Sequence, residues 1–124
     1  MTAAISQAKK KGRIAIIGRK GHAKRIINIL KKNKQIKQIG IYHPSTDNFS
    51  SGNMTYFKNF NKLFFYEKVI ISSPNHTHEK YLKRLINFKG EILCEKPAIS
   101  KSKKNLILKK YIKKKRCNLT INYN

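Results

Sequence analysis

The chain has 124 residues, the length of one ordinary domain, and 40% of them are hydrophobic, which is enough to form a core. Lysine and arginine number 29 against 5 aspartate and glutamate residues, a formal net charge of +24. No apolar run approaches the ~20 residues that span a bilayer, no secretory signal begins the chain, and two cysteines are too few for a disulfide framework. We therefore expect a cytoplasmic protein with a flexible basic leader over residues 1–11 and one domain over residues 12–124.

The first half of the domain predicts strands that alternate with helices or loops. Residues 13–17 (RIAII) form a short apolar run that ends at Gly18, as expected for a strand buried on both faces. The helix that follows has an apolar stripe at i, i+3, i+4 and i+7, formed by Ala23, Ile26, Ile27 and Leu30. We then expect a strand at 36–42, a polar loop at 43–53, a short strand at 54–57, and a short helix at 59–66 with Phe60, Leu63 and Phe64 turned inward.

The second half of the domain continues this alternation. The sequence predicts a buried strand at 69–72, ended by Pro74, and a helix at 75–88 that turns Tyr81, Leu82, Leu85 and Ile86 inward and stops at Gly90. We then expect a strand at 91–95 closed by Pro97, a basic helix from Ser100 or Ser102 to about Arg116, and a strand at 118–123. Six such strands predict the α/β fold class: a doubly wound parallel sheet in a single Rossmann-like, three-layer α/β/α domain.

The turn after the first strand is rich in glycine. Ligands of doubly wound sheets bind at the carboxyl ends of the strands, where a G-x-G-x-x-G/A turn lets the backbone approach a pyrophosphate. The frame here reads Gly18, Arg19, Lys20, Gly21, His22, Ala23, so its first and third small residues fit, whereas a lysine replaces the middle glycine. If that position requires a positive φ, lysine costs about 1 kcal/mol relative to glycine. Two glycines at such a junction can also form a tight turn without a ligand.

The end of the second strand bears on the choice between the two nicotinamide cofactors. An acidic residue there would hold a ribose 2′-hydroxyl, but the chain has Tyr42 and His43 at this point and Asp47 further along the loop. With Arg19, Lys20 and His43 close by, a 2′-phosphate would be tolerated, which slightly favours NADP over NAD. The alternatives are that Asp47 folds back towards the ribose, or that these basic groups are simply solvated.

Polar residues crowd the end of the strand at 69–72. They are Ser72, Ser73, Asn75, His76 and His78. Asn75 could cap the next helix while presenting its amide to a ribose or to nicotinamide. We expect no metal, because two histidines in H-x-H spacing at a helix start point apart and no carboxylate or thiol lies at ligand spacing.

Residues 69–97 (VIISSPNHTHEKYLKRLINFKGEILCEKP) resemble the signature region of the Gfo/Idh/MocA oxidoreductases. In that family a strand ends in Ser- or Thr-Pro-Asn, a histidine and a helix follow, and a glycine turn leads into a strand that ends in Glu-Lys-Pro. The resemblance spans residue 13 to the C-terminus. It implies that Lys96 is catalytic, lying beside the nicotinamide and the reacting hydroxyl, and that Glu95 binds a ribose. It also places Asn75 and His78 on the cofactor side. Ser73 and Asn124, which follow their strands, are further candidates for cofactor binding because ligands bind at strand ends.

The family also implies a second domain, which binds substrate and supplies a catalytic histidine. We therefore expect an NAD(P)-binding domain in truncated form, inactive alone, from an oxidoreductase of sugars, cyclitols or nucleotide sugars. An alternative is a non-catalytic module that holds a nucleotide or nucleotide sugar. The stretch IIGRKGHAK at residues 16–24 also resembles the start of bacterial sugar acyltransferases, which lack the Glu-Lys-Pro segment.

The charge raises a third possibility, a basic protein that binds nucleic acid. Lysines outnumber arginines 24 to 5 and are spread through every segment, whereas readers of specific bases rely on arginine and on aromatic stacking. We therefore expect nucleic acid to bind only non-specifically, through charge, and expect no membrane partner.

Overall fold

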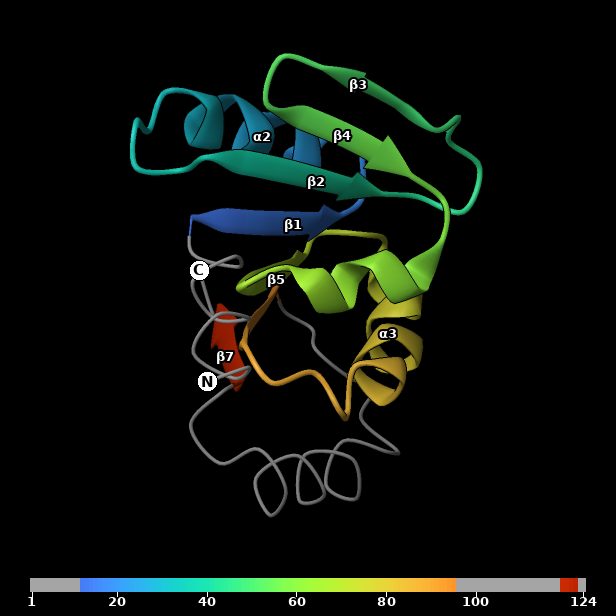
Figure 1. Cartoon of the computed structure of the whole chain (residues 1–124). Helices are drawn as coiled ribbons and strands as arrows, with labels where there is room; N and C mark the ends of the chain where they lie inside the picture. Colours follow the sequence, from blue (N-terminus) through green and yellow to red (C-terminus); the bar gives the residue numbers. More distant parts are fainter. Residues whose placement is uncertain (1–11, 96–118, 123–124) are drawn as a thin grey trace.

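The computed structural model describes residues 12–95 and 119–122, which form strands and helices around a central sheet (Figure 1). The elements are β1 (Arg13–Ile17), α2 (His22–Lys31), β2 (Gln38–Tyr42), β3 (Phe49–Ser51), β4 (Met54–Phe57), the 3₁₀ helix η1 (Phe60–Phe65), β5 (Lys68–Ile71), the 3₁₀ turn η2 (Asn75–Thr77), α3 (His78–Arg84), β6 (Glu91–Glu95) and β7 (Leu119–Asn122). The bounds of β1 and β6 are those that their apolar runs predict.

One seven-stranded sheet has the order β3-β4-β2-β1-β5-β6-β7. Every neighbouring pair is parallel except β3–β4, which is antiparallel and forms one edge. From β1 the chain moves outward through β2 to β4, then returns to place β5 on the other side of β1. This reversal is the topological switch point of a doubly wound Rossmann sheet, and it confirms the predicted fold class.

The sheet is buried on both faces because apolar side chains point alternately to each side. On one face, Ile16, Ile39 and Ile41 pack against Ala23 and Ile27 of α2. Ile26 and Leu30 are partly buried in the same cluster, which confirms the predicted apolar stripe. The opposite face packs against η1 and α3 in a second cluster rich in aromatic rings, which contains Tyr42, Phe57, Phe60, Leu63, Tyr66, Tyr81, Leu82, Leu85 and Phe88.

The loop predicted at residues 43–53 is wrong in its second half, because β3 lies there. Phe49 pairs with Tyr56 and Ser51 with Met54, so residues 52 and 53 form a two-residue hairpin turn. Gly52 has a φ of 60°, the left-handed conformation that such turns require. All three residues of β3 are exposed, so the strand lacks the apolar pattern that would have predicted it.

The helix predicted at residues 75–88 is shorter than expected. A 3₁₀ turn precedes α3, which ends at Arg84, although Leu85 and Phe88 remain buried beyond it. Gly90 therefore does not end the helix. A Cβ at Gly90 would overlap the carbonyl oxygen of Glu67, so glycine is needed there for the close approach of two backbone segments.

Several predictions fall outside the described residues: the leader at 1–11, Pro97 and the basic helix between 100 and 116. Within 12–95 and 119–122, no helix is both long enough and apolar enough to cross a membrane.

Candidate functional site

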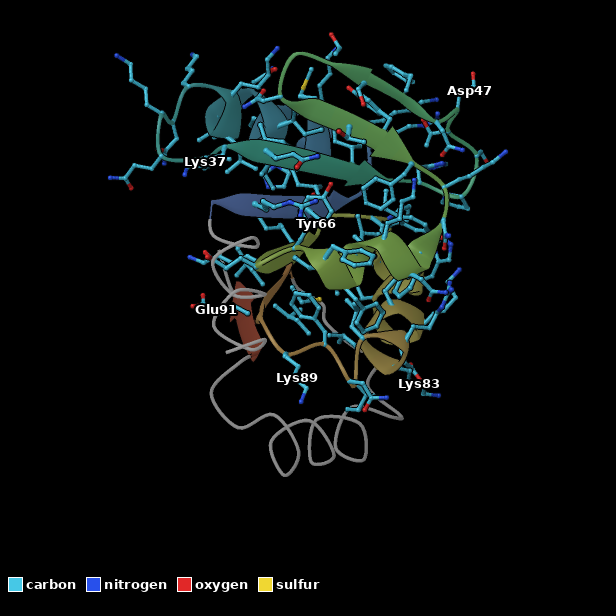
Figure 2. All side chains as sticks on the ribbon, in the orientation of Figure 1. Lys37, Asp47, Tyr66, Lys83, Lys89 and Glu91 are labelled. Atoms are coloured by element: carbon cyan, nitrogen blue, oxygen red, sulfur yellow. The ribbon has the colours of Figure 1, made fainter. Side chains whose placement is uncertain are left out.

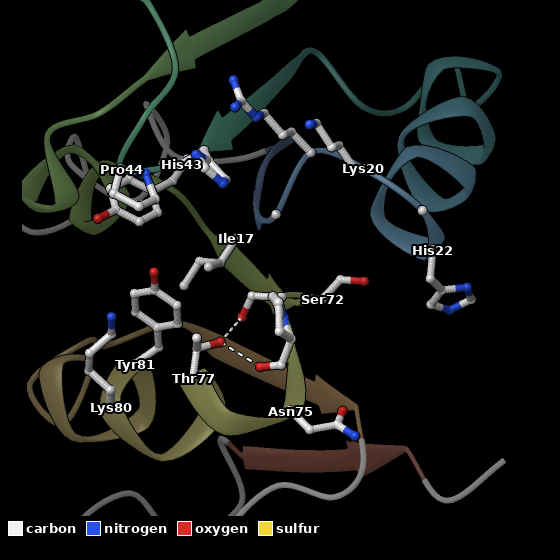
Figure 3. Close-up of a pocket in the computed structure, with 16 residues that line it drawn as sticks. Ile17, Lys20, His22, His43, Pro44, Ser72, Asn75, Thr77, Lys80 and Tyr81 are labelled. Atoms are coloured by element: carbon white, nitrogen blue, oxygen red, sulfur yellow. Dashed lines mark hydrogen bonds between the residues drawn. The ribbon is translucent and has the colours of Figure 1, made fainter.

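A cleft of about 590 Å³ opens where β1, β2 and β5 end (Figure 3). Three segments form it: the turn from β1 into α2, the residues that end β2 and follow it, and the stretch from the end of β5 into α3. It therefore lies at the switch point between β1 and β5, where doubly wound sheets bind their ligands. Eight predicted site residues line this cleft: Gly18, Arg19, Lys20, Gly21, His22, His43, Ser73 and Asn75.

Gly18 lets the ends of three strands meet. Its φ is +125°, which side chains rarely allow, and its N–H donates to the carbonyl oxygen of Tyr42 at 3.0 Å. A Cβ at this position would lie 2.9 Å from the carbonyl oxygen of Ser72 and 3.2 Å from the Cβ of Ala23. Ala23, also predicted as a site residue, is fully buried against Gly18 and does not line the cleft.

Gly21 leaves the N-terminus of α2 open to the cleft. It is the N-cap residue, with a φ of 57°, and no atom would lie within 4 Å of a Cβ placed on it. The helix has no side-chain cap hydrogen bond and no acidic residue in its first turn. Backbone N–H groups and the positive end of the helix dipole are therefore available to an anion at this wall.

Basic side chains gather at the same end of the cleft. Figure 3 shows Lys20 and His43 at one rim, and Arg19 lines it with them. Arg19 Nε is buried without a hydrogen-bond partner among the described residues. His43 Nδ1 accepts a hydrogen bond of 3.0 Å from the N–H of Ser45, so the neutral ring carries its proton on Nε2. Partial burial, followed by the charges of Arg19 and Lys20, lowers the pKa of His43 below its usual 6.5.

Asp47 does not contribute to this rim. The residue is exposed in the loop before β3 (Figure 2), and no acidic side chain from the described part of the chain lines the cleft. The field at this end is therefore positive throughout, as a bound phosphate group requires.

The facing wall is held by hydroxyl groups, and Lys80 of α3 lines it further along. Thr77 Oγ1 donates to the carbonyl oxygen of Pro74 at 2.6 Å, and lies 2.6 Å from Ser73 Oγ. Because the single hydroxyl proton of Thr77 is used on Pro74, Ser73 must donate to Thr77. The lone pairs of Ser73 Oγ then remain able to accept a hydrogen bond from a ligand.

The residues on either side of Thr77 have different surroundings. Asn75 is exposed and lines the cleft, but it caps neither helix: Pro74 precedes η2, Thr77 precedes α3, and neither makes a side-chain cap hydrogen bond. The cap predicted for Asn75 is therefore wrong. His78 is buried with 1% of its surface exposed, and its Nε2 donates to the carbonyl oxygen of Ser73 at 2.7 Å. It supports this wall from behind, and its direct contact with a cofactor stays a prediction.

His76 is exposed, and no cluster of three or more His, Cys, Asp or Glu side chains within residues 12–95 and 119–122 could hold a metal ion.

Two tyrosines at the base of the cleft were not among the predicted cofactor-binding residues. The Tyr42 and Tyr81 rings meet edge to face with centroids 6.0 Å apart, and Lys80 Nζ lies 4.8 Å from the centroid of Tyr81. Burial, followed by the electrostatic effect of Tyr42, raises the pKa of Tyr81, so its hydroxyl stays protonated. Tyr42 was a candidate because it ends the second strand, where ligands of such sheets bind, whereas the sequence placed Tyr81 only on the inner side of a helix.

The remaining predicted residues follow the next strands of the sheet. Glu95 ends β6, which pairs with β5, and its backbone is opposite Asn122 of β7. The carboxyl end of β6 therefore lies one strand away from the end of β5. Lys96 and Asn124 lie outside the described residues.

Comparisons with known proteins agree with this geometry. The model of the Gfo/Idh/MocA oxidoreductase family, NAD-binding Rossmann fold, matches residues 12–123. A putative NADPH-dependent oxidoreductase from Desulfitobacterium hafniense superposes with a TM-score of 0.73 at 18% identity, over 91% of this chain and 35% of that structure. The myo-inositol dehydrogenase of Lactobacillus casei, solved with NAD(H) and myo-inositol, superposes with a TM-score of 0.73 at 15% identity, over 89% of this chain and 36% of that structure.

A third solved structure extends the range of substrates. The UDP-N-acetylglucosamine 3-dehydrogenase of Acidithiobacillus ferrooxidans gives a TM-score of 0.66 at 14% identity, over 88% of this chain and 37% of that one. The chain thus spans little more than a third of the length of these three structures. No curated protein sequence matches it significantly.

Proposed function

Because the chain belongs to the Gfo/Idh/MocA family of oxidoreductases through its NAD-binding Rossmann domain, we propose that the cleft holds the cofactor of an enzyme that oxidises or reduces a sugar, cyclitol or nucleotide sugar. The observation that carries this proposal is the pair Gly18 and Gly21, which frames the N-terminus of α2 at the switch point of the sheet. Two structural relatives act on substrates of this class, an inositol and a UDP-sugar.

The residues present fit a dinucleotide. At Gly21 the backbone is unobstructed, so a pyrophosphate can approach the first turn of α2. The facing wall offers Ser73 Oγ as an acceptor and the exposed amide of Asn75, groups suited to ribose hydroxyls or a carboxamide. Cleft volumes of roughly 300–1,000 Å³ are usual for ligand sites, and the volume here, about 590 Å³, falls in that range.

The basic rim favours NADP over NAD in this proposal. Arg19, Lys20 and His43 meet where the ribose of the adenosine half follows the second strand. A 2′-phosphate would give the buried Nε of Arg19 the hydrogen-bond partner that it lacks among the described residues. A 2′-hydroxyl would find no carboxylate there.

The bound nicotinamide supplies the hydride acceptor or donor, and the protein handles the proton. In our proposal Lys96, which follows β6, polarises the reacting hydroxyl as a cation and so eases the loss of its proton to the catalytic histidine of the second domain, while Glu95 accepts hydrogen bonds from a ribose. Both assignments rest on the resemblance of Glu-Lys-Pro to the family motif. Turnover and substrate choice are proposals for the whole enzyme, because the chain spans so small a part of its structural relatives.

A titration of cofactors tests the proposal directly. At about 0.15 M salt, fluorescence titration should show that NADPH binds more tightly than NADH. Arg19→Ala should lower the affinity for NADPH about tenfold, because one charge-assisted hydrogen bond is removed. The affinity for NADH should change by less than about threefold. Lys89→Ala, a surface change outside the cleft, is the control for net charge.

Two outcomes would contradict this reading. A protein that binds neither nicotinamide dinucleotide has no such cofactor site. A protein that binds a UDP-sugar, but neither dinucleotide, would instead be the non-catalytic nucleotide-sugar module.

A further inference from the structure

A second groove, of about 470 Å³, lies between α2 and β4, on the other side of the turn formed by Arg19, Lys20 and Gly21. Lys24, Asn28 and Lys31 of α2 form one side. Its floor is apolar and consists of Ile27, Met54 and Tyr56. Apart from the shared turn, none of these residues lines the cofactor cleft.

The groove is open because the crossover from β2 to β4 contains no helix. Parallel strands are usually joined through a helix that covers the face of the sheet. Here the connection instead carries β3, which extends the sheet at its edge. Met54 and Tyr56 therefore pack against the α2 cluster on one side and stay partly exposed on the other.

The α2 side of the groove carries positive charges in a line. Lys24, Asn28 and Lys31 stand at i, i+4 and i+7, so they share one stripe of the helix. Lys24 and Lys31 are separated by about 10.5 Å along the helix axis, and Lys20 continues the line past the N-terminus. No acidic side chain of the described residues lines the groove. A ligand that neutralises this stripe must carry negative charges spaced along its length.

An aromatic surface lies beside the groove, on β3 next to Tyr56, although Phe49 does not itself line the groove. Phe49 and Tyr56 are register partners in β3 and β4, and their rings stack with centroids 4.3 Å apart and an interplanar angle of 9°. Phe49 is 50% exposed, which is unusual for so large an apolar side chain. Its ring is available for another flat ring to stack on.

We propose that this groove binds a single strand of nucleic acid without sequence preference, with phosphates along Lys24 and Lys31 and a base on Phe49. A basic groove that follows the backbone, beside an aromatic ring that stacks a base, is the usual design for single strands. A lone mononucleotide brings only one charged group to this stripe of cations, and a duplex keeps its bases stacked inside. A second copy of this chain is disfavoured because each copy carries a formal charge of +24.

The test uses the full chain with saturating NADPH, so that the cofactor cleft is filled, and a fluorescently labelled single-stranded oligonucleotide at about 0.15 M salt. Fluorescence anisotropy should show that Lys24→Glu with Lys31→Glu weakens binding at least tenfold. The matched pair Lys62→Glu with Lys89→Glu has the same change in net charge but lies outside both grooves, and should weaken binding less than threefold. NADPH affinity should be unchanged in both.

The aromatic contact has its own matched control. Phe49→Ala should weaken oligonucleotide binding by about tenfold, since one base loses its stacking partner. Phe65→Ala removes a ring that is 60% exposed in η1, and should leave binding unchanged. Circular dichroism confirms that each variant is folded.

The proposal is overturned if both lysine pairs weaken binding equally, if Phe49→Ala has no effect, or if polyglutamate displaces the strand as well as an unlabelled strand does. Equal competition by AMP would assign the groove to free nucleotides instead. None of these results depends on whether the cofactor cleft prefers NADPH or NADH.

Discussion

Two strand-to-helix turns face each other across the cleft and are built by opposite means. The turn from β1 into α2 contains two glycines with positive φ and no side-chain cap on its helix. The turn from β5 into α3 contains no glycine and is fixed by the side chains of Ser73, Thr77 and His78. Arg19, Lys20 and His43 surround the first turn, whereas the second turn itself offers hydroxyl and amide groups and has one lysine, Lys80, in the helix after it.

The difference matches what each wall would bind in the proposed site. A pyrophosphate is best met by backbone N–H groups, and any side chain between them and the phosphate would keep it away. A neutral part of a ligand needs a few acceptors and donors in fixed positions, which hydrogen-bonded hydroxyl groups provide. The first wall therefore depends on glycines that expose the backbone, and the second on side chains that hydrogen-bond to one another and to the backbone.

The sharpest test of the first wall compares its two glycines. Gly18→Ala should lower the free energy of unfolding by about 3 kcal/mol, because a positive φ is combined with a clash against Ser72. Gly21→Ala should cost only about 1 kcal/mol, since its Cβ enters open space and only the backbone is strained. Urea denaturation measures both.

For Gly21→Ala we expect the loss of cofactor affinity to exceed the loss of stability. Its new methyl group would stand in the cleft wall beside the first turn of α2, so NADPH affinity should fall more than stability does. Equal losses of stability at Gly18 and Gly21 would show that packing against Ser72 is not what requires glycine at position 18.

The second wall is tested through His78. His78→Phe should lower the free energy of unfolding by about 2 kcal/mol, because the carbonyl oxygen of Ser73 loses its donor. His76→Phe, two residues earlier on an exposed position, should change stability by less than about 0.5 kcal/mol. If His78 only supports the turn, NADPH affinity should change less than about threefold. A tenfold loss of affinity with unchanged stability would show a direct contact instead.

The sequence predicted most of the sheet because buried parallel strands are short apolar runs that end at glycine, proline or polar residues. Arg13–Ile17 and Glu91–Glu95 were predicted to the residue. The cleft was also predicted, because the carboxyl ends of such strands converge at the switch point. What failed was structure without an apolar signal: Phe49–Ser51 is an exposed edge strand, and its pairing depends on Gly52.

Residues that directly follow a strand line the cleft as the sequence placed them, whereas positions within helices were placed less accurately. Whether these residues bind a cofactor stays a prediction. His78 and Asn75 belong to the same sequence motif, yet one is buried and the other exposed. Asn75 opens the 3₁₀ turn η2 and lines the cleft, whereas His78 begins α3 and turns back onto the carbonyl oxygen of Ser73. Tyr81 was predicted as an inward-facing residue of this helix, and it also lines the cleft.

The smallest expected effect is a shift in the pKa of His43, which measures the positive charge at this end of the cleft. The pKa of the ring should lie below 6.5 in an NMR titration, because burial and the charges of Arg19 and Lys20 disfavour the protonated form. Lys20→Ala should raise this pKa, and 2′-AMP should raise it further by placing a phosphate beside the ring. As the pH falls through 6.5, the unfolded chain takes up this proton first, so His43 lowers the free energy of unfolding there, and His43→Gln should remove that part of the pH dependence. A pKa at or above 6.5 in the free protein would contradict both the burial of the ring and its exposure to the charges of Arg19 and Lys20.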